Sequence, residues 1–387
     1  MVISGAGPAG ARAASLCARQ GLRALLLERE AVPREKCCAG GLLDRASGLL
    51  GEPLPDRVIE QEITSVGLIH RDFRTDFELP TRAAVTVRRS VFDAYLVERA
   101  ERSGAEMWTS SSISKVREST EGLEIVIGGR SIRSRALIVA EGAISRTASA
   151  LFGPYPGRNQ GIGIAMTCTL PRDPGGRMEY YLMGTPIERF PFRFKFPLNG
   201  WMFATKGGAN IGVTGKDLGG AVYRDALDAL QKEVERKYGE ASETRISAHP
   251  IPMVPRRKLA TRRCVLIGDA AGFASPLSGE GMTNAFRSAA HAAEAVSGLI
   301  HDDRPLSSYR RMVATDILPV LRASRTISPQ AQWLMGIVDT SVLMRKMSGD
   351  AELVSICLDI SKGERSWEAL LGVIARRFPY LFFSSLT

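Results

Sequence analysis

The sequence lacks the features that mark several specialised classes of protein. It has no uninterrupted apolar run of transmembrane length, so we expect no membrane-spanning helix. Its 6 cysteines are scattered along 387 residues without a CxxC or CxxCxxC spacing, which excludes a disulfide scaffold and predicts no metal or cluster site. This cysteine usage favours a reducing, cytoplasmic compartment. The hydrophobic content of 44% and the charged content of 24% exclude a disordered chain.

Acidic residues are also fewer than basic ones: the sequence has 41 aspartates and glutamates against 51 lysines and arginines, which gives a net charge of +10. This excess favours an anionic partner: a phosphate-bearing cofactor, a nucleic acid or the headgroups of a membrane surface. Charge alone does not choose among these three. A secretory signal is not expected, because a glycine motif that begins at Gly5 leaves no room for one.

Glycine is abundant, and its first cluster predicts a dinucleotide-binding unit. The opening MVISGAGPAGARAASLCARQGLRALLLERE reads as a short strand, a glycine turn, a helix and a second strand. Gly5, Gly7 and Gly10 form GxGxxG, which provides a tight turn, backbone approach to a pyrophosphate and close helix packing. Glu28 ends the second strand, where a carboxylate accepts from a ribose hydroxyl, so FAD or NAD fits better than NADP. The candidate cofactor contacts of this unit are Gly5, Gly7, Ala9, Gly10, Glu28 and Arg29.

A second cofactor site is predicted far along the chain, in RRCVLIGDAAGFASPLSGEGMTNAFRSAAHAAEAV. An apolar strand leads to Gly268 and Asp269, and a loop of small residues precedes a long alanine-rich helix. Asp269 can accept from ribityl hydroxyls, while helix-start amides can face the electron-rich edge of a reduced flavin. The candidate contacts here are Gly268, Asp269, Gly279, Gly281 and Met282.

The segment GDAAGFASPLSGEG resembles the second FAD motif of para-hydroxybenzoate-hydroxylase-type flavoproteins, in the form used by the geranylgeranyl reductase family. VRRSVFDAYLVERAERSGAE is similar to that family's RxxFDxxLxxxAxxxGAE helix, which implies that Arg89 contacts the flavin and that Phe92 packs beneath it. ALIVAEGAISRTA resembles the ADGxxS turn, but Glu141 replaces the aspartate and leaves the role of that carboxylate open. The resemblance covers roughly residues 1–300.

The segment PREKCCAGGL resembles the family's KxCGG motif. The resemblance implies that Gly40 and Gly41 let the backbone approach the flavin ring and that Cys38 is a proton donor or redox-sensitive contact. A small buried apolar residue is the alternative for Cys38. Lys36 is a candidate cofactor contact, or alternatively a surface charge. Cys37 has no role beyond packing, and a disulfide between these neighbouring cysteines is excluded by their short Cα separation.

Two further stretches resemble the family's lipid-binding sheet. PFRFKFPLNG is similar to YxWxFP, which lines a substrate tunnel, although phenylalanine stands where the family often has tyrosine and tryptophan. GGANIGVTG is similar to the NxG strand that follows. Ordinary strands with aromatic side chains in a core are the alternative. The implied tunnel residues are Phe192, Phe194, Phe196, Pro197 and Gly212.

The resemblance implies an α/β fold: a Rossmann-like FAD-binding domain, an inserted antiparallel-sheet substrate domain and a C-terminal helical region. We expect the FAD-binding domain to be discontinuous, at 1–60, 85–155 and 255–300. The substrate sheet is expected at 61–84 and 156–254, and the helical region at 301–387.

The function implied is an FAD-dependent reductase that saturates C=C bonds of geranylgeranyl or related isoprenoid chains, on a membrane ether lipid, a prenyl diphosphate or another prenyl lipid. A flavin monooxygenase acting on an aromatic or polyketide is the first alternative, because one fold supports many activities. A non-catalytic lipid-binding relative is the second.

Electron supply and membrane contact are open in the sequence. NADPH on a brief visit or a ferredoxin can serve as donor, and RRKLATRR, Arg256–Arg263, is either a docking patch for its negative charge or a solvated strand flank. The closing RRFPYLFFSSLT suits a lipid interface, or else packs as a tail over the core. We therefore expect a cytoplasmic protein with possible peripheral membrane contact, and no nucleic-acid partner.

Overall fold

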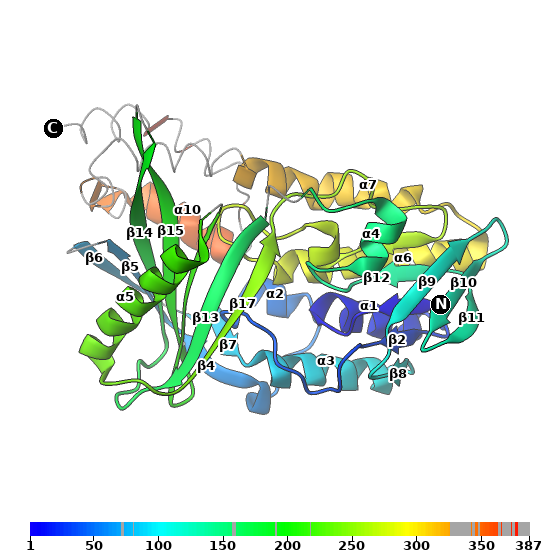
Figure 1. The fold of residues 1–387 in the computed structure, drawn as a ribbon, viewed down its shortest axis with the longest axis horizontal. Coiled ribbons are helices and arrows are strands. Elements are labelled where there is room, and N and C mark those ends of the chain that lie inside the picture. The colour runs from blue at the N-terminus through cyan, green and yellow to red at the C-terminus, as the bar shows by residue number, and fades with distance from the viewer. Residues whose placement is uncertain are drawn as a thin grey trace.

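The computed structural model describes most of the chain. Its backbone covers residues 1–325 except 71–72, 80, 157–159, 190–191 and 217, and further along 342, 345–346, 349–362, 365, 373 and 376–377. Side chains are described for all of these except 160, 184–189, 192–197, 357–358 and 360–362. Figure 1 shows two lobes side by side, one crossed by long helices and the other built of long upright strands.

The first lobe holds a parallel sheet of five strands in the order β18-β12-β1-β2-β8. These strands are β1 (Val2–Ser4), β2 (Leu25–Leu27), β8 (Glu106–Trp108), β12 (Leu137–Val139) and β18 (Cys264–Leu266). The residues of β1, β12 and β18 are all buried, as a parallel sheet covered by helices requires, whereas the edge strand β8 begins with the exposed Glu106. The covering helices include α1 (Pro8–Arg19), α3 (Arg89–Arg102) and α6 (Met282–Asp302).

Smaller elements complete this lobe. An antiparallel sheet of three strands consists of β9 (Ile113–Glu118), β10 (Leu123–Ile127) and β11 (Arg130–Ser134). Another three-stranded sheet, in the order β3-β7-β4, consists of β3 (Gly41–Leu43), β7 (Ala84–Val87) and β4 (Ile59–Ile63). The short helices are α2 (Asp44–Gly48), η1 (Asp56–Val58), α4 (Arg146–Phe152) and η3 (Gly268–Ala271).

The second lobe is a seven-stranded sheet in the order β17-β13-β16-β15-β14-β5-β6. Its strands are β5 (Ser65–His70), β6 (Phe73–Glu78), β13 (Gln160–Thr169), β14 (Arg177–Arg189), β15 (Phe192–Thr205), β16 (Gly208–Lys216) and β17 (Ser242–Pro252). All neighbours are antiparallel except β14 and β5, which run parallel. Helix α5 (Gly220–Tyr238) covers one face with Tyr223, Leu227 and Leu230, and the other face turns toward the first lobe.

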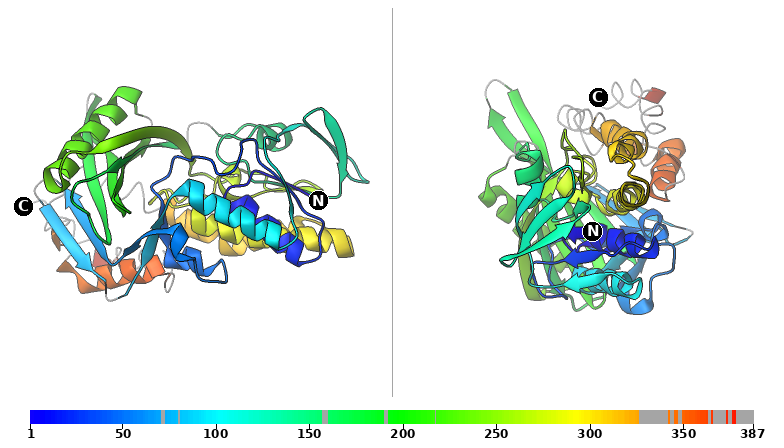
Figure 2. Two further views of the ribbon diagram at one scale, coloured as in Figure 1. Left: turned by 90° about the horizontal axis from the view of Figure 1, so that it is seen from below. Right: turned by 90° about the vertical axis from the view of Figure 1, so that its right-hand side faces the viewer.

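Helices follow the second cofactor segment, and Figure 2 shows them along the first lobe and beneath the sheet. Helix α7 (Ser307–Asp316) packs on α6, and α10 (Ala351–Lys362) contacts α2. Together with the parallel sheet, they confirm the predicted α/β class with a helical C-terminal region. In the part of the chain with assigned coordinates, no helix combines the length and apolar character that a membrane crossing needs.

The predicted interfacial tail is described only at its start. Arg376 and Arg377 pair with Glu352 at 2.8 and 3.2 Å, and Arg377 also pairs with Asp350 at 3.1 Å. The aromatic residues that follow, 378–383, lie outside the described residues.

Candidate functional site

In the glycine loop between β1 and α1, two glycines lie where a larger side chain would overlap the backbone, and the third has free space beside it. Gly5 has a φ of +99°, and a Cβ there would lie 2.4 Å from the carbonyl oxygen of Ala140. A Cβ on Gly10 would lie 1.8 Å from the Gly5 oxygen. A Cβ on Gly7 would meet only Nη2 of Arg34, at 3.6 Å. The space at Gly7, beside a guanidinium and the start of α1, therefore suits an approaching phosphate.

Glu28 lies where the sequence predicts, at the end of β2. It is 5% exposed, and its Oε2 accepts from the backbone N–H of Ala6 at 3.0 Å. Arg34 binds the same oxygen at 3.1 Å and reaches Asp93 at 3.1 Å with its other arm. Arg29, by contrast, is exposed and pairs with Glu30 at 3.0 Å. Glu28 is thus held in place by Arg34, whereas no described contact directs Arg29 into the site.

Helix α3 brings Arg89 to the same region. Arg89 forms two hydrogen bonds to Asp93, one turn along, at 2.8 and 2.9 Å. Burial opposes the charge, but Asp93 more than compensates and raises the pKa of Arg89. Phe92 is fully buried and packs edge-on against Phe286 of α6, with ring centroids 6.5 Å apart. Phe92 therefore joins α3 to α6 beneath this region.

The second predicted cofactor segment meets the first. Gly268 has a φ of +56°, and a Cβ there would lie 3.0 Å from Cβ of Ala9 in α1. The Asp269 carboxylate accepts no hydrogen bond from any residue the structure describes, although Lys36 and Arg89 face it. Burial raises the pKa of Asp269, and these two positive charges oppose that shift. A carboxylate in this condition fits the hydroxyl groups of a ribityl chain.

The start of α6 stands next to this carboxylate. A Cβ on Gly281, the residue before Met282, would lie 3.3 Å from Oδ1 of Asp269. Gly279 has a φ of +71°, so the loop turns through a conformation that favours glycine, and its nearest neighbour would be 4.0 Å away. The N–H of Thr283 in the first turn of α6 donates to Glu280 at 2.7 Å, and the positive dipole end of the helix lies here, which suits an electron-rich ring edge.

Glu141 has a clear structural role, which the sequence left open. Its carboxylate accepts from Ser4 Oγ at 2.5 Å, Ser145 Oγ at 2.6 Å and Thr147 Oγ1 at 2.6 Å. Ser145 in turn caps α4 by accepting from the N–H of Ala148 at 2.9 Å. Glu141 thus ties the end of β1 to the start of α4.

Lys36 is not a surface charge, and that alternative is wrong. It is half-buried and contacts Nε2 of His249, 213 residues further along the chain on β17. Burial and then the nearby Arg89 lower the pKa of Lys36 to about 8, although Asp269 opposes the shift. Burial and then the charge of Lys36 lower the pKa of His249 to about 4. The contact links the first lobe to the edge strand of the second.

The two neighbouring cysteines face different surroundings. Cys37 Sγ donates to the carbonyl oxygen of Ser247 at 3.4 Å and packs on the sheet, and burial raises its pKa. Cys38 packs against the core of the first lobe, and its Sγ accepts from the N–H of Gly40 at 3.4 Å. Both are free thiols. A direct chemical role for Cys38 stays a prediction.

Gly40 and Gly41 meet protein atoms on their open sides. Gly40 has a φ of +80°, and a Cβ there would lie 2.5 Å from the Val87 oxygen. A Cβ on Gly41 would lie 2.9 Å from the ring of Phe203. The described structure therefore explains both glycines by close packing of β3 on β7 and on the seven-stranded sheet, whereas their approach to a flavin ring stays a prediction.

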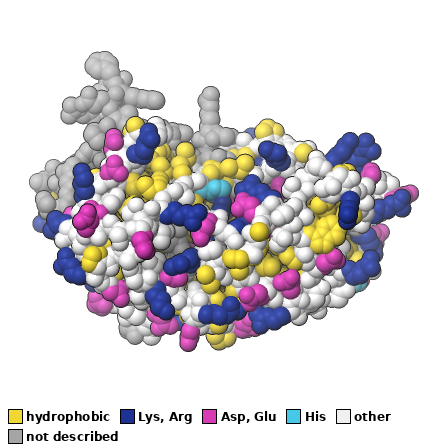
Figure 3. Space-filling model, turned by 60° about the horizontal axis from the view of Figure 1, so that its bottom comes forward, with side chains coloured by type: hydrophobic (Ala, Val, Ile, Leu, Met, Phe, Trp, Pro, Cys, Tyr) yellow, Lys and Arg dark blue, Asp and Glu magenta, His cyan; other side chains and the backbone are white. Residues whose placement is uncertain are grey.

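An aromatic wall covers the sheet face that turns toward the first lobe. We use this name for Tyr180, Trp201 and Phe203, which lie on β14 and β15. The rings of Tyr180 and Phe203 are 5.3 Å apart, and those of Trp201 and Phe203 are 6.5 Å apart. Gly212 lies opposite Trp201 on β16, where a Cβ would come within 2.1 Å of the indole. Figure 3 shows hydrophobic side chains grouped beside a histidine on a surface otherwise dotted with charges.

Asn210 joins the aromatic wall to the cysteine segment. Its Oδ1 accepts from Trp201 Nε1 at 2.8 Å, and its Nδ2 donates to the Cys38 oxygen at 3.1 Å. Of the predicted tunnel residues, Gly212 lies on this face. The side chains of the others lie outside the described residues: Phe192, Phe194, Phe196 and Pro197.

The wall and His249 were missed from the sequence. Aromatic residues two apart in NGWMFAT, at 201 and 203, carry the strand period that points both to one face, and this signal was available. Nothing in the local sequence marks His249, because its importance comes from a partner 213 residues away.

The basic stretch RRKLATRR is partly structural. Arg256 is 5% exposed and donates to the carbonyl oxygens of Ala270 and Gly153 at 3.0 and 2.5 Å. Arg263 likewise donates to backbone oxygens of two loops. Only the positions between them, 257, 258 and 262, are exposed. A donor-docking role stays a prediction and would depend on those three.

Taken together, the glycine loop, Glu28 and Asp269 converge at the carboxyl ends of the parallel strands, where open α/β sheets bind ligands. The open space at Gly7 fits a diphosphate, and the unbonded Asp269 carboxylate beside the α6 N-terminus fits a flavin chain. The described residues therefore fit FAD.

Comparison with known proteins supports this assignment. A family described as FAD binding domain matches residues 1–312. Chloroplastic geranylgeranyl diphosphate reductase of Arabidopsis thaliana is 28% identical over 330 residues, covering 76% of this chain and 65% of that enzyme. The chain thus spans slightly less than two thirds of the plant enzyme. Menaquinone reductase of Mycolicibacterium smegmatis is 29% identical over 312 residues, covering 76% of this chain and 75% of that protein.

Solved structures share the fold. A geranylgeranyl bacteriochlorophyll reductase-like protein of Thermoplasma acidophilum superimposes with a TM-score of 0.76 at 19% identity, over 98% of this chain and 96% of that one. A flavin-dependent halogenase superimposes with a TM-score of 0.68 at 21% identity, over 98% and 77% of the two chains. Since the family match extends over most of the sequence, this chain belongs to the FAD-binding-domain family, and within it resembles the geranylgeranyl reductases.

Proposed function

We propose that this protein is an FAD-dependent reductase that saturates C=C bonds of geranylgeranyl or related isoprenoid chains. The observation that carries the proposal is the aromatic wall of Tyr180, Trp201 and Phe203, which faces the lobe that holds the FAD residues. Isoprenoid chains have no polar groups along their length, so burial against such rings is their main means of recognition. The named relatives act on substrates with such chains or on a quinone.

Reduction of the alkene requires both a hydride donor and a proton donor. An isolated C=C bond has no carbonyl to receive negative charge, so hydride addition at one carbon needs a proton at the other. FAD supplies the hydride when it is bound and reduced. The chain's own residues hold the cofactor through Asp269 and the start of α6, and the aromatic wall orients the substrate and excludes water.

The electron donor and the membrane contact extend this proposal. We propose that NADPH or a ferredoxin reduces the flavin, because either donor is anionic and the protein carries a net charge of +10. A prenyl lipid substrate would in addition bring the protein to the inner face of a membrane.

Anaerobic turnover tests the reductase. The purified protein is reduced with dithionite and mixed with geranylgeranyl diphosphate or a menaquinone, and the products are measured by mass spectrometry. Gains of paired hydrogens support the proposal. An absence of gain with every prenyl substrate contradicts it.

A flavin monooxygenase is the second candidate, and the shared fold with a halogenase favours keeping it. Incubation with NADPH, oxygen and aromatic or polyketide compounds tests it, because hydroxylated products would replace hydrogenated ones. A non-catalytic lipid-binding relative would be colourless after purification and would not take up FAD on reconstitution.

A further inference from the structure

The contact between Lys36 and His249 is unusual for a half-buried ammonium. No carboxylate of the described chain lies within 4.0 Å of the Lys36 ammonium, since the ion pairs found there involve other cations. An ammonium group only donates hydrogen bonds, so Nε2 of His249 must accept. The imidazole is therefore neutral, with its own proton on Nδ1, and the pair holds a single ionising proton.

The charges around the pair are predominantly positive. The groups that face Lys36, besides His249, are Arg89 of α3, Asp269 of η3, and Arg34 and Cys38 of its own segment. Those that face His249 are Lys36, Arg89 and Arg29. Burial and the excess of positive charge disfavour the ammonium form of Lys36, so its pKa is lowered to about 8.

The position of His249 places the pair at the edge of the aromatic wall. Across the sheet, one row of directly paired residues is Leu182, Asn199, Thr214, Gly163 and His249. The next row on the same face is Tyr180, Trp201, Gly212, Ala165 and Ser247. His249 thus faces the first lobe one row beyond Trp201.

The His249 row also carries two orphan polar atoms. Asn199 Oδ1 and Thr214 Oγ1 are buried and have no hydrogen-bond partner among the described residues. Buried polar atoms of this kind are normally satisfied by ordered water or by a ligand. Water held along this row would connect the edge of the aromatic wall to the proton held by the pair.

Two other proton-bearing groups of this region, Tyr180 and Cys37, give up their proton less readily. Partial burial and then the nearby Glu280 raise the pKa of Tyr180 above its ordinary value of about 10, although the residue is 37% exposed. Burial likewise raises the pKa of the Cys37 thiol, which already donates to Ser247. Lys36 differs because its surroundings favour loss of the proton.

We propose that the Lys36–His249 pair supplies the proton for alkene reduction, with Lys36 as the proton holder and His249 as its positioning residue; this rests on the proposed reductase function. An N–H bond of Lys36 breaks as a C–H bond forms at one alkene carbon. The other carbon receives a hydride, with its electron pair, from reduced FAD, which becomes oxidised FAD. Solvent then returns a proton to Lys36, so one alkene, one hydride and one proton give the saturated product.

A titration of the histidines tests the pair without any turnover. In protein with isotope-labelled histidine, NMR is used to follow His249 against pH in the wild type and in Lys36→Met. Loss of the neighbouring charge should raise the pKa of His249 by a unit or more, an increase of about tenfold in proton affinity. His291, which pairs with Asp316 on α7, is the internal control and should not move. An unchanged His249 overturns the coupling.

The pH profile of a single turnover tests the chemistry. Enzyme pre-reduced with dithionite should reduce a prenyl substrate at a rate that falls above about pH 8, where Lys36 loses its proton. Lys36→Met should lower the rate by about 10²- to 10⁴-fold and remove that limb. His249→Gln, whose carbonyl still accepts from Lys36, should keep more of the rate than His249→Phe.

Failure of the pair is distinguishable from failure of the reductase function. A wild type that reduces its substrate while Lys36→Met matches its rate and profile overturns the proton role. Loss of the basic limb in Cys38→Ala but not in Lys36→Met assigns the proton to the cysteine instead. A folded, FAD-loaded wild type that reduces no prenyl substrate contradicts the proposed function and with it this use of the proton, whatever the histidine titration shows.

Discussion

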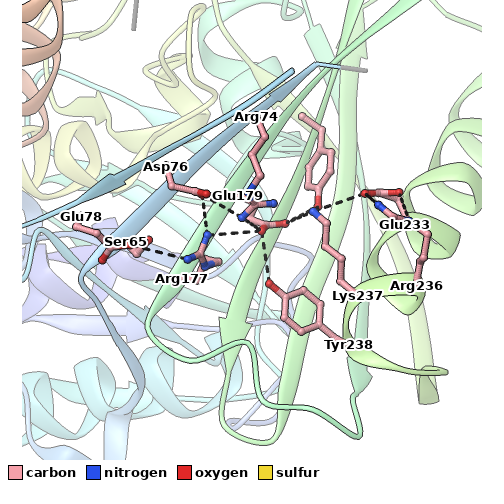
Figure 4. Close-up of polar contacts among 11 residues, drawn as sticks. Ser65, Arg74, Asp76, Glu78, Arg177, Glu179, Glu233, Arg236, Lys237 and Tyr238 are labelled. Carbon is pink, nitrogen blue, oxygen red and sulfur yellow. Dashed lines mark hydrogen bonds and ion pairs between the residues drawn. The ribbon is translucent and has the colours of Figure 1, made fainter. Parts of the chain in front are cut away.

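Two polar clusters in this molecule differ in whether a buried charge is paired with opposite charge. The Glu179 cluster, comprising Arg74, Arg177, Glu179, Tyr181, Lys237 and Tyr238, joins β6, β14 and α5 on the second lobe (Figure 4). Glu179 is 0% exposed and accepts from Arg74 at 2.8 Å, Lys237 at 3.4 Å and Tyr238 at 3.4 Å. The pair of Lys36 and His249, between the lobes, has a cation that no carboxylate pairs with in the part of the chain that the structure describes.

The contrast separates structural charge from chemical charge. A buried carboxylate surrounded by donors is fully satisfied, so it stabilises one arrangement of strands and helix. A half-buried ammonium whose hydrogen-bond partner among the described residues is an imidazole is held less favourably, and its proton is correspondingly easier to remove. Substitutions in the first cluster should therefore change stability, whereas substitutions in the second should change chemistry.

The largest expected effect is at Glu179. Glu179→Gln removes the negative charge from among two arginines and a lysine, and should lower the free energy of unfolding by about 3–5 kcal/mol, as for a broken buried ion pair. Denaturant unfolding measures it. Glu62→Gln is the matched control, because Glu62 pairs with Arg82 at an exposed site and should cost about 1 kcal/mol or less. Equal effects of the two substitutions would refute the structural role of the cluster.

Gly212→Ala should follow in size. The new Cβ would lie 2.1 Å from the Trp201 ring, so the indole must move, with an overpacking cost of about 1–3 kcal/mol. Thermal unfolding and tryptophan fluorescence report the change. Gly207→Ala is not a suitable control because its φ is +75°, whereas Gly48→Ala meets nothing within 4 Å and should leave both signals unchanged. Unaltered fluorescence in Gly212→Ala would contradict the expected movement of the Trp201 indole.

Gly7→Ala should affect the cofactor more than the fold. Its Cβ meets only a guanidinium 3.6 Å away, so stability should change by no more than about 0.5 kcal/mol, while FAD affinity falls because the phosphate approach is filled. Gly10→Ala should instead disrupt the fold, because its Cβ would overlap the Gly5 oxygen at 1.8 Å. Apoprotein melting and FAD titration separate these effects. Normal FAD affinity in Gly7→Ala would place the diphosphate elsewhere.

The smallest effect is expected at Asp316, which pairs with His291 at 2.8 Å and Arg287 at 3.3 Å. The hydrogen bond from His291 lowers the pKa of Asp316, so its stabilisation is present above the unfolded value of about 4 and disappears as pH falls through the lower folded value. Since the side chain is 38% exposed, Asp316→Asn should cost well under 1 kcal/mol near neutral pH. A difference that grows toward low pH would contradict this assignment.

Sequence reasoning found what local patterns encode. The βαβ unit, the turn at Gly5, the close packing at Gly10 and the strand before Asp269 were correct because periodicity and turn chemistry act within about thirty residues, whereas the cofactor contacts stay predictions. The partners of Lys36 and Asn210 were not predictable in the same way. They depend on the register of a sheet whose strands come from two separate parts of the chain, with β5 and β6 joining strands about a hundred residues later.

The resemblance to a family predicted the positions of motifs but not the contacts of their side chains. It identified the cysteine segment, but it did not show that Lys36 turns toward β17 or that Gly40 and Gly41 meet Val87 and Phe203. Glu141 was the opposite case, since a departure from the family motif proved to be a well-bonded residue. Motifs mark positions, whereas the roles of their side chains depend on contacts with distant segments.

Asn210 has a consequence for how this protein can evolve. One amide accepts from the Trp201 indole through its oxygen and donates to the Cys38 carbonyl through its nitrogen, so two separate atoms of one short side chain serve both partners. Aspartate lacks the donor, and leucine lacks both groups. A lineage that exchanges Trp201 to admit a different substrate therefore leaves an unpaired acceptor beside the cysteine segment, so substrate range and cofactor-side geometry can change only through paired substitutions.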